Sequence, residues 1–399
     1  MTTPFSTTRV TLAAAGVRYS KWTRVTIGRD LRDITGHFSV AYYDEGRAAA
    51  AMPGTARGAV PSPVLRRQAC TLAIDGETVL DGWTDKVAGA NDAKHIDTSI
   101  TGRDRTGDLA DCAAAPNGPA EWRNANLLQI AQQICAPFGI TVTAQAPVGA
   151  PFPRLAINPH ETPLAAIEKA ARQRGLLVLS DGVGGLLLTD GGRSAAPADI
   201  RRGVNVLDVR FSFDDTKRFS DIYVKGQSEK AAGRRPAGGA PIGHDYAPGP
   251  IPLPPNAQAT EGAGILMTGH AVDPEVTRYR PSVRMVRTQS GGATVQQQAE
   301  WAVRVARGES SRLVFTVPDW RAGPSNALWR PNTTVRVVDP YSGVDDVMLI
   351  RAVTYRIGPD GEHPNTPLTD IDVIGLTAFD RIEQPANRVP LKPAGGGTP

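Results

Sequence analysis

Three mixed-charge turns hold the residues of this 399-residue chain whose types and spacing could do chemistry. They are Thr101–Cys112 (TGRDRTGDLADC), Asp215–Ser220 (DTKRFS) and Asp273–Pro281 (DPEVTRYRP). An arginine guanidinium binds a carboxylate through paired hydrogen bonds, so such turns can fix the geometry of an interface. The alternative is a solvated surface on which each ion pair contributes little. From these turns we select a candidate interface or structural charge network of seven residues: Arg103, Arg105, Asp108, Asp111, Arg218, Arg278 and Arg280.

Motifs for catalysis are missing. A nucleophilic serine on a strained turn needs Gly-x-Ser-x-Gly, which does not occur. His160 and Glu161 are adjacent, but a zinc peptidase needs a second histidine one helical turn away. Gly182–Gly185 lacks the third glycine of a dinucleotide-binding loop. Forty acidic residues leave a glycosidase carboxylate pair open, although none lies in an apolar stretch flanked by aromatic residues. We therefore predict no catalytic residue, no cofactor and no metal site.

Cysteine usage and charge exclude further classes. Cys70, Cys112 and Cys135 are far apart and form no Cys/His cluster, which argues against a zinc site or a disulfide framework. The 44 basic and 40 acidic residues leave a net charge of +4, too small for a protein whose main ligand is nucleic acid. Neither a signal peptide nor a membrane-spanning run is recognisable, so we expect a soluble protein made in the cytosol.

Short strands must position most of these residues. The 41 glycines and 33 prolines favour many strands joined by turns over long helices. The first hundred residues alternate in polarity and include a hairpin around Asp75–Gly76, and strands of this spacing are typical of a barrel or a sandwich. Helical spacing of Leu127, Ile130 and Ile134 predicts a helix, and Thr162–Pro163 begins a second.

Six segments resemble a known family. They are Trp22–Leu31, Gly102–Cys112 before an Asn-capped helix that ends at Pro137-Phe-Gly-Ile, Glu168–Leu177, Arg218-Phe-Ser, Asp273–Pro281 and Leu328–Asn332. Together they resemble the baseplate hub proteins of Mu-like contractile-tailed phages (the phage tail or late control protein D superfamily) over about residues 20–380, and their order and spacing carry the resemblance.

The resemblance implies an α+β, mainly β chain with two antiparallel β-barrel domains and small α/β insert domains. Three chains would form a trimeric pseudo-sixfold ring. The predicted divisions are 1–112 (first β-barrel domain), 113–203 (α/β domain with two helix–strand units), 204–290 (strands of the second barrel, with a Gly/Pro-rich loop at 226–263), 291–318 (helix–strand insert), 319–382 (remaining strands of the second barrel) and 383–399 (flexible tail).

The implied function is that of a structural hub that adapts a sixfold tail tube to a threefold central spike, because two similar barrels in each of three subunits present six near-equivalent surfaces. The implied partners are two further copies of the chain, the spike, the tail tube, other baseplate proteins and the tape measure protein. DNA would only pass through the lumen. The protein would reside in the virion tail baseplate after assembly in the cytoplasm of the bacterial host.

Alternative functions remain open at this level. One is the hub portion of a related contractile injection system, pyocin or type VI-like, although no long repetitive β-helix follows the predicted barrels. Another is a tail-associated peptidoglycan hydrolase, and a third is a receptor- or carbohydrate-binding module. We expect a protein that is not an enzyme.

Overall fold

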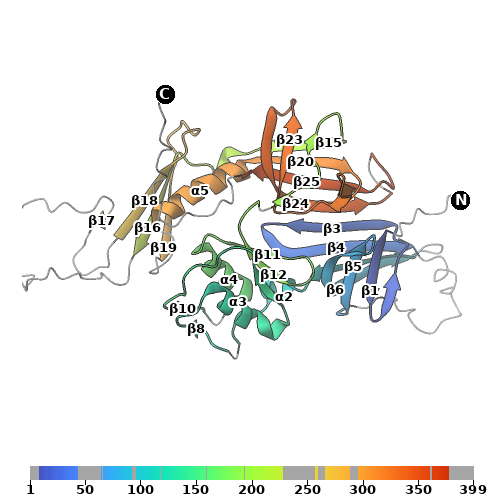
Figure 1. Cartoon of the computed structure of the whole chain (residues 1–399), viewed down its shortest axis with the longest axis horizontal. Helices are drawn as coiled ribbons and strands as arrows, with labels where there is room; N and C mark the ends of the chain where they lie inside the picture. Colours follow the sequence, from blue (N-terminus) through green and yellow to red (C-terminus); the bar gives the residue numbers. More distant parts are fainter. Residues whose placement is uncertain are drawn as a thin grey trace, which may run out of the picture.

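The computed structural model describes residues 9–43, 64, 66–91, 96–116, 118–158, 160–192, 194–227, 257–258, 266–287, 295–359 and 362–376. Most of the predicted Gly/Pro-rich loop at 226–263 and all of the predicted tail at 383–399 lie outside these residues. The fold is mainly β with few helices, as expected (Figure 1).

One sheet of fourteen strands runs through both β-rich parts of the chain. Its continuous path, in pairing order, is β15 (Asp208–Phe213), β20 (Ser311–Pro318), β25 (Leu368–Gly375), β24 (Val344–Ile357), β3 (Arg24–Asp30), β4 (Asp33–Tyr43), β7 (Ile96–Asp104), β6 (Glu77–Asn91), β5 (Ala69–Ile74), β1 (Val10–Ala14) and β2 (Val17–Tyr19). Off this path, β23 (Thr333–Asp339) pairs with β24, while β13 (Ser194–Ala195) and β14 (Ile200–Arg201) pair with β23.

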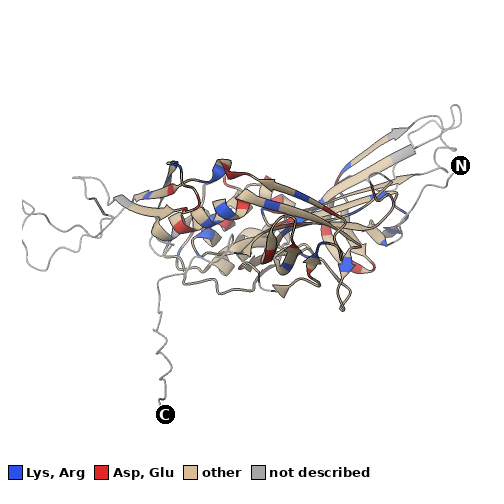
Figure 2. Ribbon diagram, turned by 90° about the horizontal axis from the view of Figure 1, so that it is seen from above, with Lys and Arg blue, Asp and Glu red and all other residues tan. Residues whose placement is uncertain are grey.

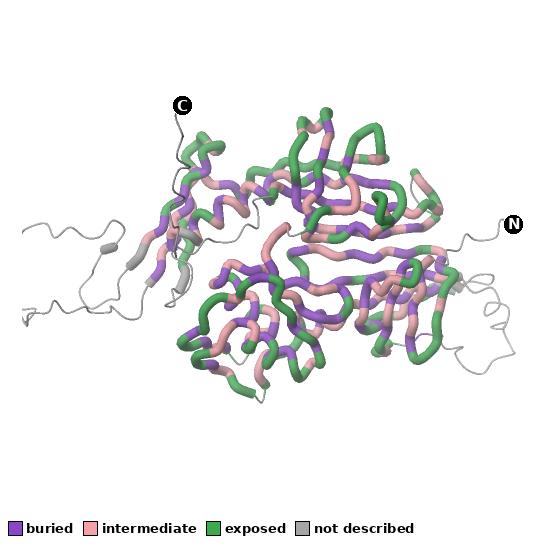
Figure 3. The backbone as a smooth tube through the Cα atoms, in the orientation of Figure 1, coloured by how far each residue is buried: buried purple, intermediate pink, exposed green. Residues whose placement is uncertain are grey.

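The two expected barrels do not appear as separate closed units within the described part of the chain. The pairing path there is open and ends at β15 and β2. The physical reason is the antiparallel pairing of β24 with β3, which joins the two parts edge to edge. They also share one hydrophobic core, and buried residues recur along the strands of both parts (Figure 3). The fully buried Trp22 of the first part and Trp320 and Trp329 of the last part belong to the same cluster.

A five-strand repeat is present in this sheet. The first half has the order β3-β4-β7-β6-β5, and the second half has the order β15-β20-β25-β24-β23. Chain order corresponds as well, since β5 and β6 precede β7 just as β23 and β24 precede β25. Both halves also carry a register shift at the same place, next to Asp85 in the β6–β7 pair and next to Arg351 in the β24–β25 pair. We call these five-strand sets the first and second repeat units.

Core residues at equivalent positions differ in size but compensate for each other. Phe38 of β4 lies opposite Gly102 of β7, and the equivalent pair is Leu313 of β20 opposite Val373 of β25. A large residue beside a glycine thus replaces two residues of intermediate size. Such exchanges preserve the filled volume of a core while they erase similarity in the sequence.

An α/β part follows the first repeat unit (Figure 1). Its predicted helices are confirmed by α3 (Leu127–Cys135) and α4 (Pro163–Arg172). The α3 helix begins with a capping box between Asn126 and Gln129, and the Thr162 hydroxyl caps α4 by accepting from the Ala165 amide. The remaining elements here are α2 (Gly107–Asp111), the 3-10 turn η1 (Ala136–Phe138) and the strands β8 (Glu121–Trp122), β9 (Val142–Ala144), β10 (Leu155–Ala156), β11 (Leu177–Ser180) and β12 (Leu186–Thr189).

A smaller sheet with one helix interrupts the second repeat unit between β15 and β20. Its strand order is β17 (Ala257–Gln258), β18 (Leu266–Val272), β16 (Asp221–Gln227) and β19 (Pro281–Arg287), and α5 (Val295–Ser310) packs on one face. Within the predicted range 204–290, β15 joins the large sheet, whereas β16 pairs with β18 and β19 in the smaller sheet. Short elements complete the described chain: η2 (Asp215–Lys217), β21 (Arg321–Ala322) and β22 (Ala327–Leu328).

Candidate functional site

The first charged turn lies at the end of β7, where strand pairing gives its arginines partners on β6 and α2. Arg103 donates from Nε to Asp85 Oδ2 at 2.9 Å and reaches Asp111 Oδ2 with Nη2 at 2.8 Å. These hydrogen bonds, that to Asp111 foremost, raise the Arg103 pKa. Arg105 pairs with Asp81 at 2.8 Å. Burial raises the pKa of Asp108, which stands in the first turn of α2.

The second and third charged turns meet in the fold. Arg218 binds Asp273 through both Nε and Nη2, at 2.9 Å and 2.8 Å, and it also reaches Glu275 at 2.7 Å. Arg307 of α5 approaches the other side of Asp273 at 2.8 Å. Only 2% of Asp273 is exposed, and this burial opposes its charge, but the bonds from Arg307 and Arg218 prevail and its pKa lies below the ordinary value. We call these four residues the Asp273 cluster.

Two further candidates lie beside this cluster. Arg280 donates to the backbone carbonyls of Asp215 and Thr216, and its guanidinium carbon lies 5.2 Å from the centre of the Phe219 ring. It therefore links the second and third charged turns. Arg278 is exposed and forms no ion pair with the described residues. The candidates with side-chain partners thus hold parts of one chain together, and their role as contacts between chains stays a prediction.

A third network escaped the sequence analysis because its members come from opposite ends of the chain. Arg9 bridges Asp75 at 2.7 Å and Asp319 at 2.8 Å. Arg321 in turn contacts Asp75 at 3.4 Å and Glu77 at 2.8 Å. Asp75 was recognisable as a turn residue, but no local signal indicates its partners Arg9 and Arg321, which lie 66 and 246 residues away. This network ties the β5–β6 hairpin to the segment that directly follows β20.

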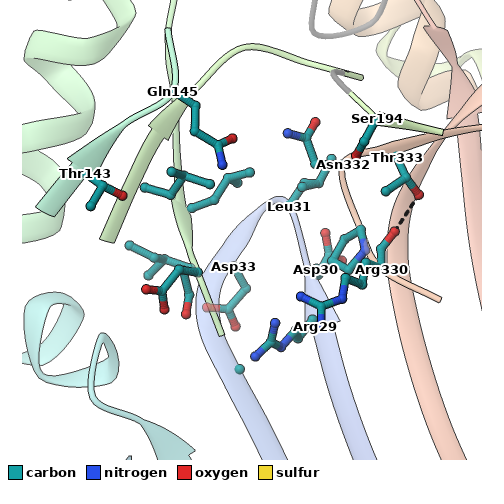
Figure 4. A pocket seen from close by; sticks show the side chains of 17 residues that line it. Arg29, Asp30, Leu31, Asp33, Thr143, Gln145, Ser194, Arg330, Asn332 and Thr333 are labelled. Atoms are coloured by element: carbon teal, nitrogen blue, oxygen red, sulfur yellow. Dashed lines mark hydrogen bonds between the residues drawn. The ribbon is translucent and has the colours of Figure 1, made fainter. Parts of the chain in front are cut away.

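A polar cavity of about 280 Å³ lies between the two repeat units and the α/β part (Figure 4). Arg29 and Asp33 line it from β3 and β4, Gln145 from the α/β part, and Arg330 from the segment before β23. Its lining residues include no histidine or cysteine, and the described part of the chain contains no group of three potential metal ligands. The cavity therefore offers polar contacts from charged, amide and hydroxyl side chains.

Beside this cavity, Asp104 joins the first repeat unit to the α/β part. The residue is 1% exposed, and its carboxylate accepts hydrogen bonds from the Gly36 amide at 3.1 Å and the Ser180 hydroxyl at 2.7 Å. Burial raises its pKa despite these bonds. Asp104 is part of the first charged turn but was not selected, since its burial has no signature in the sequence.

Charges of both signs are interspersed along the described ribbon (Figure 2). Blue and red segments alternate along the ribbon in that view, in keeping with the small net charge of +4. Among the helices in the described ranges, none has the length and apolarity needed to cross a membrane.

Three family models match successive parts of the chain. Residues 9–104 match the N-terminal domain described as Mu phage baseplate assembly protein GpP-like. Residues 106–190 match the second domain of baseplate hub protein gp44-like proteins. Residues 291–375 match the fourth domain of Mu phage baseplate assembly protein GpP. The first and last of these matches coincide with most strands of the two repeat units.

Whole-chain comparisons point the same way. The baseplate hub protein gp44 of Escherichia phage Mu is 29% identical over 350 residues, which cover 86% of this chain and 83% of that protein. The crystal structure of the 43 kDa tail protein of prophage MuSo2 from Shewanella oneidensis superposes with a TM-score of 0.74 at 29% identity, over 93% of this chain and 99% of that one. An E. coli component of the type VI secretion system shares the fold at 8% identity, with a TM-score of 0.53 over 93% and 78% of the chains.

Proposed function

We propose that the chain is a structural baseplate hub protein of the Mu-like phage type and that three copies of it form the ring that joins the tail tube to the central spike. As a hub protein it is a component of the virion. The proposed partners are the spike, the tail tube protein, other baseplate proteins and the tape measure protein, and assembly takes place in the host cytoplasm.

The observation that carries the ring is the internal repeat of the large sheet. Each chain contributes two five-strand units of equivalent order, so three chains contribute six. Six similar units suit a sixfold tube, while the true symmetry of three chains suits a threefold spike. In this proposal the two barrel domains of each chain are the two repeat units, completed by contacts in the assembled ring.

The ring is tested by two measurements on the purified protein. Light scattering after size exclusion should give about 127 kDa, three times the 42.3 kDa of one chain. Negative-stain electron microscopy should show rings with threefold averages and six similar lobes. A single-chain mass at the highest soluble concentration, with and without the phage's spike protein, would contradict the proposal.

A hub of a type VI-like injection system is the second candidate, and the shared fold of the E. coli component favours it. The two candidates differ in where the protein is found. Antibody against the chain should label the tip of phage particles if it serves a phage tail. We also propose that the hub acts without catalysis, and release of dye from labelled peptidoglycan by the pure protein would contradict this.

A further inference from the structure

The outer edge of β15 carries apolar side chains that the described chain leaves uncovered. Phe211 is 53% exposed and Phe213 is 59% exposed, and the two rings lie 5.7 Å apart. Among the described residues, β15 pairs with β20 on one side and with no strand on the other. An edge strand with exposed aromatic residues is a template for pairing with another chain.

The repeat shows what should cover this edge. Phe211 lies opposite Leu313 just as Ile27 of β3 lies opposite Phe38, so Phe211 and Ile27 occupy equivalent positions. Ile27, however, is only 1% exposed. The difference arises because β24 pairs along the outer edge of β3, whereas nothing in the described chain pairs along the outer edge of β15.

The strand equivalent to β24 is β6, and its second half is also open. In the second repeat unit, β24 pairs with β23 before its register shift and with β3 after it, through Ala352–Ile357. In the first repeat unit, β6 pairs with β5 before the shift, but after it Lys86–Asn91 pairs only with β7 among the described residues. Each chain therefore contains one complete pairing between repeat units, that of β24 with β3, and the two open strand edges of a second such pairing. We call a strand pairing that connects two repeat units a joint.

We propose that β15 of one copy pairs antiparallel with Lys86–Asn91 of the next copy, in the register that joins β24 to β3 within the chain. This inference rests on the proposed ring and identifies the strand pairing that connects neighbouring copies in it. Counting from the register shifts, Val87 takes the place of Val353 and Gly89 that of Tyr355. Val87 then lies opposite Phe213, and Gly89 lies opposite Phe211. A glycine opposite an aromatic residue leaves the ring room to lie across the neighbouring strand.

The charges of two facing residues agree with this register. Within the chain, Ala352 lies opposite Asp30. The equivalent residues of the open joint are Lys86 and Asp214, which are both exposed and opposite in charge. Opposite charges at directly facing positions of two strands stabilise their pairing, whereas a shift by one residue would remove this match.

The joint also explains how the proposed ring closes. Because the two open edges of one chain differ, the contact is head to tail, and such contacts form rings when the rotation closes. Three copies give six joints around the ring. Three of them are the β24–β3 joint within a chain, and three are the β6–β15 joint between chains.

Disulfide trapping tests the register directly. Cys112 is exposed and is replaced by serine first, while Cys70 and Cys135 are buried and remain. In this background, Val87→Cys with Phe213→Cys should form covalent dimers and trimers on non-reducing gels after mild oxidation, since facing residues meet disulfide geometry. The matched control, Val87→Cys with Val209→Cys, moves one cysteine four residues along β15, roughly 13 Å, and should stay uncrosslinked. Crosslinking of the control alone would overturn the register.

A second variant separates failure of the joint from failure of the ring. Phe211→Ser should weaken trimer formation at least tenfold without lowering the melting temperature of the monomer, because Phe211 is exposed there. Tyr279→Ser, at an 86% exposed residue outside β15, is the control and should leave the trimer intact. A wild-type trimer that neither crosslinks in register nor responds to Phe211→Ser would overturn the joint and leave the ring standing. A strictly monomeric wild type would overturn both.

Discussion

Phe38 and Gly102 face each other on neighbouring strands, and the glycine has no space for a side chain. A Cβ atom at Gly102 would lie 2.6 Å from the Phe38 ring and 2.1 Å from the Trp83 carbonyl oxygen. We therefore expect Gly102→Ala to destabilise the fold by about 1–3 kcal/mol, the range of overpacked cores. Urea unfolding measures this.

A control and a double variant sharpen that prediction. Gly375→Ala, at the end of β25 with open space around the site, should leave the free energy of unfolding within about 0.5 kcal/mol of wild type. Phe38→Leu should not rescue Gly102→Ala, because the Trp83 carbonyl oxygen stays in place. A full rescue would mean that the ring alone excludes a side chain at Gly102.

The Asp273 cluster should hold the smaller sheet and α5 in place. Asp273→Asn removes the charge between Arg218 and Arg307, and loss of one partner in a buried pair costs about 3–5 kcal/mol. Asp215→Asn removes a different partner of Arg218, but that carboxylate is 69% exposed, so this control should cost less than about 1 kcal/mol. Equal losses for the two variants in urea unfolding would contradict the assigned role of Asp273.

Acid should weaken the same cluster. The pKa of Asp273 lies below its ordinary value, so its contribution to stability is present above the pKa of the unfolded chain and is lost as pH falls through the folded value. Wild type should therefore lose stability relative to Asp273→Asn below about pH 4, the ordinary range of Asp. Melting temperatures of both proteins from pH 7 to pH 2 measure the difference, and parallel curves would refute it.

Asp104 should have the opposite effect on the pH dependence of stability. Burial raises its pKa, so the folded state favours the protonated form, and stability falls as pH rises from the unfolded pKa through the folded one. The uncharged Asp104→Asn variant should lack this component, so the wild-type minus variant stability should decrease between about pH 4 and neutrality. Urea midpoints across this range are the measurement, and a difference that grows with pH would be contrary to expectation.

Local signals predicted most of the elements. The hairpin at Asp75–Gly76 and the Thr162–Pro163 helix start are confirmed, because turn and capping chemistry acts over a few residues. The residues from Val276 to Arg287 predict a strand, but β19 begins only at Pro281. The residues between them belong to the turn that the Asp273 cluster holds, so ion pairs from distant elements decide where this strand begins.

Pairings between distant segments were not predictable in the same way. Asp273 and Arg218 are separated by 55 residues, and both turns were selected as charged, yet nothing in either turn identifies the other as its partner. The repeat units were hidden for a different reason. Their equivalent core pairs combine residues of different sizes, as with Phe38–Gly102 and Leu313–Val373. In addition, the smaller sheet separates β15 from β20 in the sequence.

That separation has a consequence for synthesis on the ribosome. The strands of the first repeat unit all lie within residues 24–104, so they can pair soon after they emerge. In the second, β15 emerges long before β20, which begins only at Ser311. At roughly 5–20 residues per second, its aromatic edge stays without its own partner for several seconds. The insertion between them thus imposes an order in which the first unit is complete, and β3 is available to β24, before the second can form.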